Sequence, residues 1–278
     1  MTFTFILVAT LVAGLGSVWI AALLASALLS RFTQHLLSLA AGALLATAFM
    51  RLLPEALEQA DHAAMSAPTL FAVLLVGVVF FFLLDKAELW HHGHEHHHGL
   101  EPQADARHVQ VLGHGHAHGH AHGHAHGHEH RPGSWAVLAG DSVHCFGDGI
   151  LIASAFMADL QLGVLAALAV LAHEVPHHMG DLVVLREGAS TRHAATLKVS
   201  LAGAVTALGG AVGHVLVDAL EGFLPYFLAM ASSSFIYVAL ADLIPQLQKR
   251  LSARETAAQV LWLAIGMALV MAVGVAVH

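Results

Sequence analysis

Two short histidine–carboxylate clusters lie inside stretches that otherwise resemble membrane-spanning helices. The first reads His-Cys-Phe-Gly-Asp-Gly over residues 144–149, and the second reads His-Glu-Val-Pro-His-His-Met-Gly-Asp over residues 173–181. An ionisable side chain at the centre of a bilayer costs about 2.5–3.5 kcal/mol even on translocon-insertion scales. Imidazole nitrogens and carboxylate oxygens are also the ligands that divalent transition metals take in proteins. The two clusters therefore predict a metal site inside a membrane.

The motif at residues 144–149 places its polar side chains on one helix face. His144 and Asp148 are four residues apart, and Asp141 lies three residues before His144. Residues at these spacings lie one above the other on a helix. Cys145 points about 100° away from His144 on the same helix. As a thiolate it would be a soft ligand, and as a lone buried thiol it would be inert core.

The motif at residues 173–181 forms a longer stripe of polar side chains along its helix. Glu174, His177, His178 and Asp181 fall at positions i, i+3, i+4 and i+7, and His173 lies one turn before His177 at the edge of the stripe. A set of polar side chains that satisfy one another in a helix bundle is the structural alternative. Four histidines and four carboxylates on two helices exceed what packing requires, and we therefore favour a metal site.

Composition assigns the chain to the membrane class. Hydrophobic residues make up 57% of the sequence and charged residues 11%, whereas soluble domains carry about 25% charged residues. Runs of near 20 apolar residues predict an all-α membrane protein with eight transmembrane helices. We place these spans near residues 3–29, 34–54, 69–90, 134–158, 161–184, 197–217, 224–245 and 257–277.

A histidine-rich segment divides the chain. Residues 1–90 hold spans one to three, residues 91–131 form a loop that we expect to be disordered, and residues 132–278 hold spans four to eight. Sixteen of the 25 histidines lie between residues 91 and 130. The loop is either a metal-capturing segment or a repeat-expanded linker with incidental affinity. The histidines we assign to capture are His91, His92, His94, His114, His116, His118 and His120.

The basic residues predict the orientation. Eight spans put both termini on one side, and ten of the eleven Lys and Arg residues then fall in or near the loops of the other side, Arg51 being the exception. The positive-inside rule places both termini outside and the histidine-rich loop in the cytosol, most simply in a cell (inner) membrane. The acidic outer loops would attract cations, and nothing in the charge of −8 indicates a nucleic-acid partner.

A weak internal echo favours an inverted repeat. Span two ends in Met-Arg-Leu-Leu-Pro-Glu (50–55) and span seven in Ala-Asp-Leu-Ile-Pro-Gln (241–246), and these spans run in opposite directions. Inverted repeats in transporters hold the substrate site between their halves. Spans four and five would then be a central pair.

The paired motifs resemble those of the histidine-rich branch of the ZIP family of divalent-metal transporters, which carries His-Asn-Phe-x-Asp-Gly and His-Glu-x-Pro-His-Glu-x-Gly-Asp. The resemblance extends to the eight spans and the loop position. It implies a transporter of zinc or a related divalent cation into the cytosol, and often a homodimer. It also implies inverted three-helix repeats (spans 1–3 and 6–8) around a central pair (spans 4–5).

By position, the resemblance assigns His144, Asp148, Glu174 and His177 as metal ligands and His173 as an accessory residue. The sequence departs from the branch at two motif positions, because Cys145 replaces Asn and His178 replaces Glu. Thr206 also stands where binuclear relatives carry Glu. The first metal position therefore matches, and the second matches incompletely. We count Cys145, His173, His178 and Asp181 as additional candidate ligands.

We therefore expect a transporter with Zn²⁺ as its substrate, Fe²⁺, Cd²⁺ and Mn²⁺ being other candidate ions, and no enzymatic activity. Asp242, near the cytosolic end of span seven, is a candidate for the exit path. Two alternatives remain. His173-Glu174-x-x-His177 matches the His-Glu-x-x-His motif of metalloproteases, although Pro176 interrupts it. Histidine-rich loops also occur in metal exporters, but those resemble six-span proteins with a soluble C-terminal domain.

Overall fold

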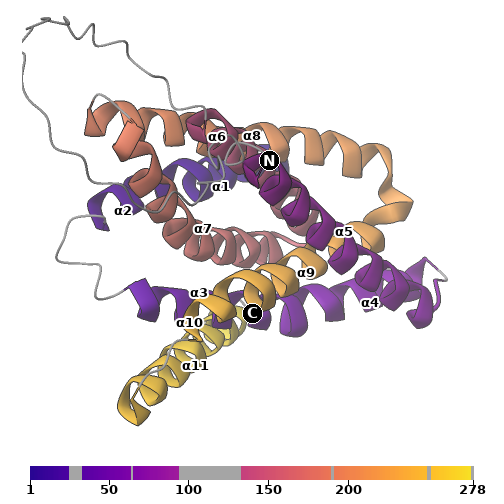
Figure 1. Cartoon of the computed structure of the whole chain (residues 1–278). Coiled ribbons are helices and arrows are strands. Elements are labelled where there is room, and N and C mark those ends of the chain that lie inside the picture. Colours follow the sequence, from indigo (N-terminus) through magenta and orange to yellow (C-terminus); the bar gives the residue numbers. More distant parts are fainter. Residues whose placement is uncertain (25–32, 64, 94–132, 189–190, 249–251, 277–278) are drawn as a thin grey trace, which may run out of the picture.

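The computed structural model describes residues 1–24, 33–63, 65–93, 133–188, 191–248 and 252–276. Over these residues the chain consists of helices joined by short turns, and it contains no strand (Figure 1). Seven of the described helices are long and apolar enough to cross a membrane by length and composition. The predicted all-α membrane architecture is therefore confirmed, and the count of eight spans stays a prediction. The long helix outside these seven, α6 (Gly133–Ala158), is the one that carries Asp141, His144 and Asp148.

Several of the long helices contain a π-helical turn. The first runs through α1 (Thr2–Leu11), η1 (Val12–Gly16) and α2 (Ser17–Leu24). The second runs through α3 (Thr33–Thr47), η2 (Ala48–Leu52) and α4 (Leu53–His62). The uninterrupted helices are α5 (Ala67–Gly93), α6, α7 (Leu160–Gly188), α8 (Arg192–Ala219) and α11 (Ala253–Ala276). Between α8 and α11 the chain forms η4 (Glu221–Phe223), α9 (Leu224–Tyr237), η5 (Val238–Leu243) and α10 (Ile244–Leu247).

The two echo segments have the same local construction. In each, a π-helical turn is followed immediately by an α-helical turn with proline near its start, Pro54 after η2 and Pro245 after η5. Proline has no N–H to continue the i−4 ladder, and a wider turn accommodates the interruption. This shared construction supports the inverted repeat, which itself stays a prediction.

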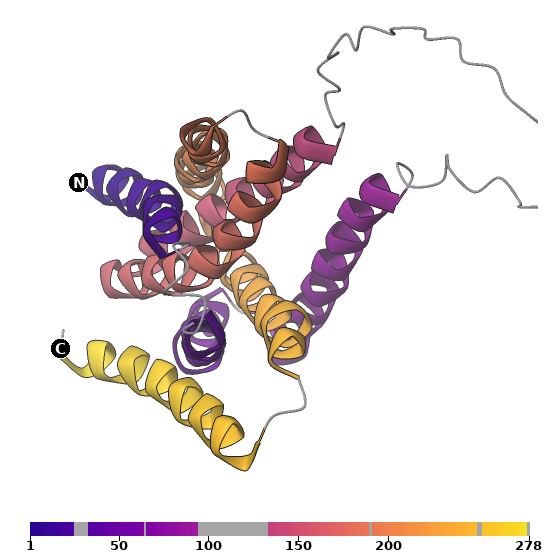
Figure 2. The ribbon, with the colours of Figure 1, turned by 60° about the vertical axis from the view of Figure 1, so that its left-hand side comes forward.

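The helices pack as two groups that meet at the centre. One group contains α1–α2, α6, α7 and α8, and the other contains α3–α4, α5, α9–α10 and α11. The groups meet where α7 packs on α3 and α6 packs on α9. In Figure 2, α5 and α11 lie at the periphery, and only 11% and 17% of their apolar windows are buried. The central helices α6 and α7 therefore carry the predicted ligands where two helix groups adjoin.

Glycine residues let α6 and α8 approach closely beside Asp148. A Cβ on Gly149 would collide with the carbonyl oxygen of Thr206, and a Cβ on Gly209 would collide with the carbonyl oxygen of Phe146. Small residues allow such backbone contact between membrane helices, where dispersion rather than water exclusion drives association. The contact fixes α8 beside the segment of α6 that carries Asp148.

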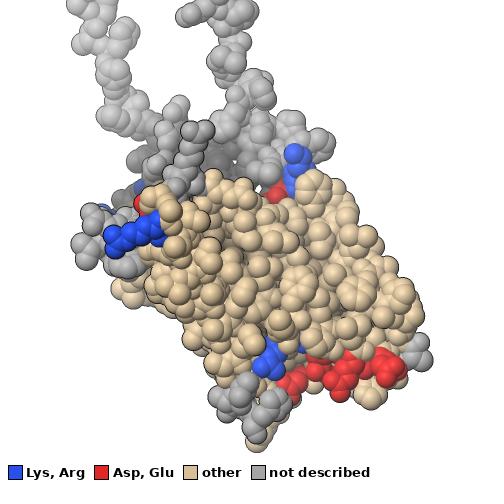
Figure 3. Space-filling model, turned by 90° about the horizontal axis from the view of Figure 1, so that it is seen from below, with Lys and Arg blue, Asp and Glu red and all other residues tan. Residues whose placement is uncertain are grey.

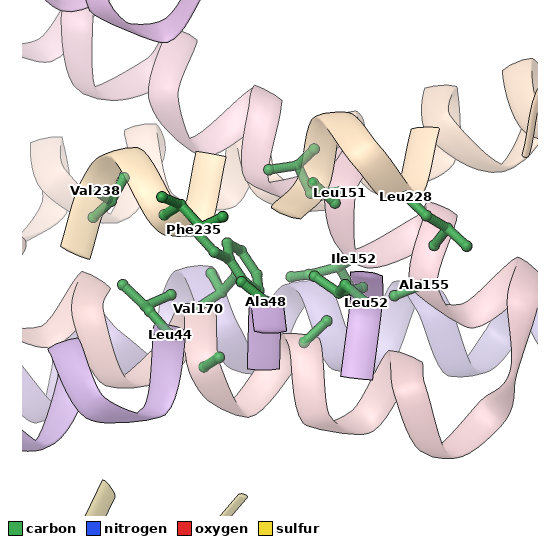
Figure 4. Packing of buried hydrophobic residues seen from close by; sticks show 14 of the residues in the cluster. Leu44, Ala48, Leu52, Leu151, Ile152, Ala155, Val170, Leu228, Phe235 and Val238 are labelled. Atoms are coloured by element: carbon green, nitrogen blue, oxygen red, sulfur yellow. The ribbon is translucent and has the colours of Figure 1, made fainter. Parts of the chain in front are cut away.

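Buried apolar side chains pack together in the middle of the bundle (Figure 4). We call this group the apolar seal. Its members come from α3–η2, α6, α7 and α9, and they include Leu44, Ala48, Leu52, Leu151, Ile152, Ala155, Val170, Leu228 and Phe235. Phe235 is the largest of them and is 1% exposed.

Charged side chains gather at the ends of the bundle. In Figure 3, acidic side chains gather along one edge, and a broad uncharged belt separates them from charged side chains at the opposite edge. A cavity lined by Arg51, Glu55, Glu58 and Asp159 lies beyond the apolar seal. An uncharged belt between charged ends is the surface that a membrane-spanning bundle requires.

Candidate metal centre

The first cluster joins α6 and α7 through four side chains. The Nε2 atom of His144 lies 3.2 Å from Glu174 Oε1 and 3.9 Å from Asp148 Oδ2. The Nε2 atom of His173 lies 3.2 Å from Asp148 Oδ2 and 3.3 Å from Glu174 Oε1. The two imidazole Nε2 atoms are 3.4 Å apart. We call His144, Asp148, His173 and Glu174 the first cluster.

The backbone orients His173 toward this cluster. Its Nδ1 atom lies 3.2 Å from the carbonyl oxygen of Ala169, which accepts only if Nδ1 carries the proton. The Nε2 lone pair then faces Asp148 and Glu174. A hydrogen bond on the far ring nitrogen is the usual device that fixes the tautomer and orientation of a metal-ligating histidine.

A second cluster lies on the opposite side of the Glu174 carboxylate. The Nε2 atom of His178 lies 3.1 Å from Glu174 Oε2 and 3.5 Å from Asp141 Oδ1. The Sγ atom of Cys145 lies 3.6 Å from Asp141 Oδ1 and 3.8 Å from Glu174 Oε2. We call Asp141, Cys145, Glu174 and His178 the second cluster, and all four are buried. Glu174 therefore presents one oxygen to each cluster.

A third group extends from the second cluster toward solvent. The Nδ1 atom of His177 lies 3.4 Å from Asp181 Oδ2 and 3.6 Å from Asp141 Oδ1. The His177 ring stacks on the His144 ring with a centroid separation of 5.3 Å. His177 thus contacts both the first cluster, through ring stacking, and the Asp141–Asp181 pair, through Nδ1.

The buried carboxylates lack good hydrogen bonds. Within the described residues, one oxygen each of Asp141, Asp148, Glu174 and Asp181 is buried without a hydrogen-bond partner, although imidazole nitrogens lie nearby. Buried charges without compensation are costly. Several carboxylates that converge with imidazoles in a dry interior suit a cation bound between them.

A polar cavity of about 340 Å³ connects this region to one end of the bundle. Asp141, His144 and His177 line its inner part, and Asp181 and Asp242 line it further along. Asp85 and Tyr237 also line it, and the Tyr237 hydroxyl donates a hydrogen bond of 3.0 Å to Asp85 Oδ2. The predicted exit residue, Asp242, therefore shares a cavity with His177.

The structure distributes the predicted ligands differently from the single pocket expected. It brings His144, Asp148 and Glu174 together, with His173 as their fourth member, and it places His177 at the edge with Asp141 and Asp181. Thr206 is buried next to Gly149, on the α8 side of the first cluster. His94, His114, His116, His118 and His120 lie outside the described residues, and His91 and His92 lie in α5 without described side chains.

Ser17 is a site residue that sequence reasoning missed. Its hydroxyl lies 3.0 Å from His178 Nδ1, although the two residues are 161 positions apart. No local pattern marks it, because a serine in an apolar helix ordinarily bonds to its own backbone. Only the packing of α2 against α7 reveals the contact.

Fold and site together define a polytopic helical membrane protein with a buried histidine–carboxylate metal-binding cluster. A family model described as ZIP Zinc transporter matches residues 2–274, and the chain therefore belongs to the ZIP family.

Among characterised relatives, the Zinc transporter ZIP13 homolog of Drosophila melanogaster is 27% identical over 275 residues, which cover 86% of this chain and 77% of that protein. Human Zinc transporter ZIP4 is 38% identical over 116 residues, or 41% of this chain and 18% of that protein. Human Zinc transporter ZIP6 is 35% identical over 114 residues, or 41% of this chain and 15% of that protein. The similarity thus spans less than a fifth of the length of these two human relatives.

Proposed function

We propose that the chain carries Zn²⁺ across the membrane into the cytosol, with the first cluster as its transport site. Membership of the ZIP family supports metal transport. The observation that carries the proposal is the convergence of His144, Asp148, His173 and Glu174 between two packed helices. Mixed nitrogen and oxygen ligation suits zinc and related ions, Fe²⁺, Cd²⁺ and Mn²⁺ being further candidate substrates.

The route we propose runs from the acidic end of the bundle to the opposite end. Glu55, Glu58 and Asp159 attract the cation at the outer cavity. The ion binds the first cluster and then moves past His177 and Asp181 to Asp242, which line the second cavity. We assign the Asp242 end to the cytosol because the basic loops predict that side. A transport site must also release its ion. The carboxylates of Asp181 and Asp242, which follow one another along the cavity, offer the ion successive binding positions on its way out.

The observed geometry does not favour the metalloprotease alternative. That mechanism needs His173 and His177 on one zinc ion, with Glu174 as the general base. Here His173 Nε2 faces Asp148 and Glu174, whereas His177 Nδ1 faces Asp141 and Asp181. Membership of a transporter family fits a protein that is not an enzyme. Outward flux would instead support the exporter alternative. The homodimer that the family resemblance implies is part of this proposal, and cross-linking in membranes tests it.

Uptake of radioactive zinc into proteoliposomes tests the proposal. Asp148→Asn keeps the side-chain shape but removes the charge, and we expect it to reduce uptake at least roughly tenfold, because ligand and near-ligand changes cost about 10–100-fold in metal affinity or activity. Asp218→Asn, an exposed carboxylate near the end of α8, is the matched control and should transport like the parent. Equal uptake by the parent and Asp148→Asn would remove the first cluster as the transport site.

A further inference from the structure

We propose that Asp141, Cys145, Glu174 and His178 form a second cation site that prefers thiophilic ions such as Zn²⁺ and Cd²⁺. The proposal extends the proposed function, because both clusters share Glu174. It assigns a role to the two motif positions at which this chain departs from its branch, Cys145 and His178. In this proposal the second metal position is complete, with the Cys145 thiolate in place of Asn and the His178 imidazole in place of Glu.

Five of the six separations between the four ligand atoms lie within about 0.2 Å of the edges of a metal-sized tetrahedron. Zinc bonds of about 2.0–2.3 Å imply ligand–ligand distances of about 3.3–3.8 Å. Cys145 Sγ lies 3.6, 3.8 and 3.9 Å from the Asp141, Glu174 and His178 ligand atoms. His178 Nε2 lies 3.5 Å from Asp141 Oδ1 and 3.1 Å from Glu174 Oε2. An ion at the centre would need only small side-chain adjustments.

Hydrogen bonds from outside the cluster orient His178 for ligation. The Ser17 hydroxyl donates to the carbonyl oxygen of Gly14 at 2.6 Å, which uses its one proton. The 3.0 Å contact between Ser17 Oγ and His178 Nδ1 must therefore be donated by the imidazole. His178 then has its Nε2 lone pair directed at Asp141 and Glu174. His173 has the same arrangement in the first cluster, with the Ala169 carbonyl in place of Ser17.

Asp141 supplies an independent indication that this cluster suits a cation. Its side chain is 1% exposed, and its Oδ2 atom has no hydrogen-bond partner within the described part of the chain. A buried carboxylate oxygen without a donor is costly unless a positive charge lies beside it. An inert core cysteine would need no carboxylate on either side, yet Cys145 lies between Asp141 and Glu174.

The proposed binding step releases one proton and raises the charge of the site by one. The ion replaces one proton on Cys145 Sγ, and because Asp141 lines the polar cavity, the proton has a route to water. Thiolate and imidazole ligands favour Zn²⁺ and Cd²⁺ over Mn²⁺ and Mg²⁺, which prefer oxygen. Glu174 bridges the two ions with Oε1 and Oε2 when both clusters are occupied.

Ultraviolet absorption of the purified full-length protein during titration with Cd²⁺ tests the site. A cadmium–thiolate charge-transfer band reports only Cys145, because it is the sole cysteine and the histidine-rich loop contributes no thiol. We expect the band in the parent and in Asp148→Asn, and we expect its loss in Cys145→Ser. Ser17→Ala should require roughly 10–100-fold more Cd²⁺ for half-maximal absorption. Ser154→Ala, which removes a buried hydroxyl that bonds to the Ile150 carbonyl in its own helix, is the matched control.

The outcomes separate this proposal from the proposed function. A parent protein that takes up zinc but gives no band overturns the second site and leaves transport intact. A band without uptake overturns the transport proposal and leaves the second site intact. A band of unchanged midpoint in His178→Ala would show that Cys145 binds the ion without the cluster, which also overturns the proposal. Circular dichroism verifies that each variant is folded.

Discussion

The two ends of the bundle differ in how they meet the histidine–carboxylate clusters. On one side a cavity of about 340 Å³ runs from His144 and His177 to Asp242. On the other side the apolar seal, whose packing Figure 4 shows, lies between the clusters and the acidic cavity at Glu55 and Asp159. Over the described residues the clusters thus meet a cavity on one side and packed apolar side chains on the other, which is the arrangement that alternating access requires of a transporter in any one state.

The order of residues along each helix explains the difference. In α6, Asp141, His144 and Asp148 precede Leu151, Ile152 and Ala155. In α7 the order is reversed, with Ala166 and Val170 before His173. Since α6 and α7 run in opposite directions, the apolar residues of both gather at the same end. Access from the acidic end requires that α3 and α9 separate from α6 and α7 at the seal.

The largest expected effect in this comparison is on chemical accessibility. In a Cys145→Ser background, Gly180→Cys places a thiol in the cavity, where Gly180 is exposed and has open space around it. Ala155→Cys places one in the apolar seal, where Ala155 is 0% exposed. A polar maleimide should modify Gly180→Cys at least roughly a hundredfold faster, because a buried thiol must wait for an opening fluctuation. Mass spectrometry of timed samples measures both rates.

Similar rates at the two positions would break the comparison. They would mean that the seal opens as readily as the cavity on the timescale of labelling. Denatured samples provide the reference for each thiol, since both should then react alike.

The next effect concerns the stability of the seal. Phe235→Ala removes the largest side chain of the apolar seal, and we expect a loss of about 3–5 kcal/mol in the free energy of unfolding, because the cavity left behind cannot collapse fully. Phe80→Ala, at a position 50% exposed on α5, is the matched control and should lose less than half of this. Thermal unfolding in detergent compares them. A Phe235→Ala protein as stable as Phe80→Ala would show that the seal is loosely packed.

The apolar runs of the sequence predicted the helices well and their irregularities poorly. The expected spans 134–158 and 224–245 correspond to helical segments Gly133–Ala158 and Leu224–Leu247. Length and apolarity fix such segments because a bilayer tolerates no unsatisfied backbone. The π-helical turns η1, η2 and η5 have no hydropathy signal, since they change the backbone ladder without changing composition.

The sequence also predicted which helices carry the site, but not which side chains belong to the first cluster and which to the second. Helical spacing shows that His173, Glu174, His177 and His178 share about half of a helix surface. It does not show which of them faces Asp148 on the neighbouring helix, and here this is His173 rather than His177. Ser17 contacts His178 of the second cluster across 161 positions, which periodicity on α7 cannot reveal.

The smallest expected effect lies at the mouth of the cavity, where Tyr237 of α9 donates a hydrogen bond to Asp85 of α5. Neither side chain is buried, so we expect Tyr237→Phe to lower the free energy of unfolding by only about 0.5–1.5 kcal/mol, the net worth of a hydrogen bond in a protein. A double-mutant cycle with Asp85→Ala isolates the contact from the separate effects of each change. A coupling energy near zero would mean that water at the open end replaces the bond at no cost, and the two ends would then differ in packing alone. A coupling above this range would mean that a specific contact holds α5 and α9 together at the cavity mouth, as packing holds the helices together at the apolar seal.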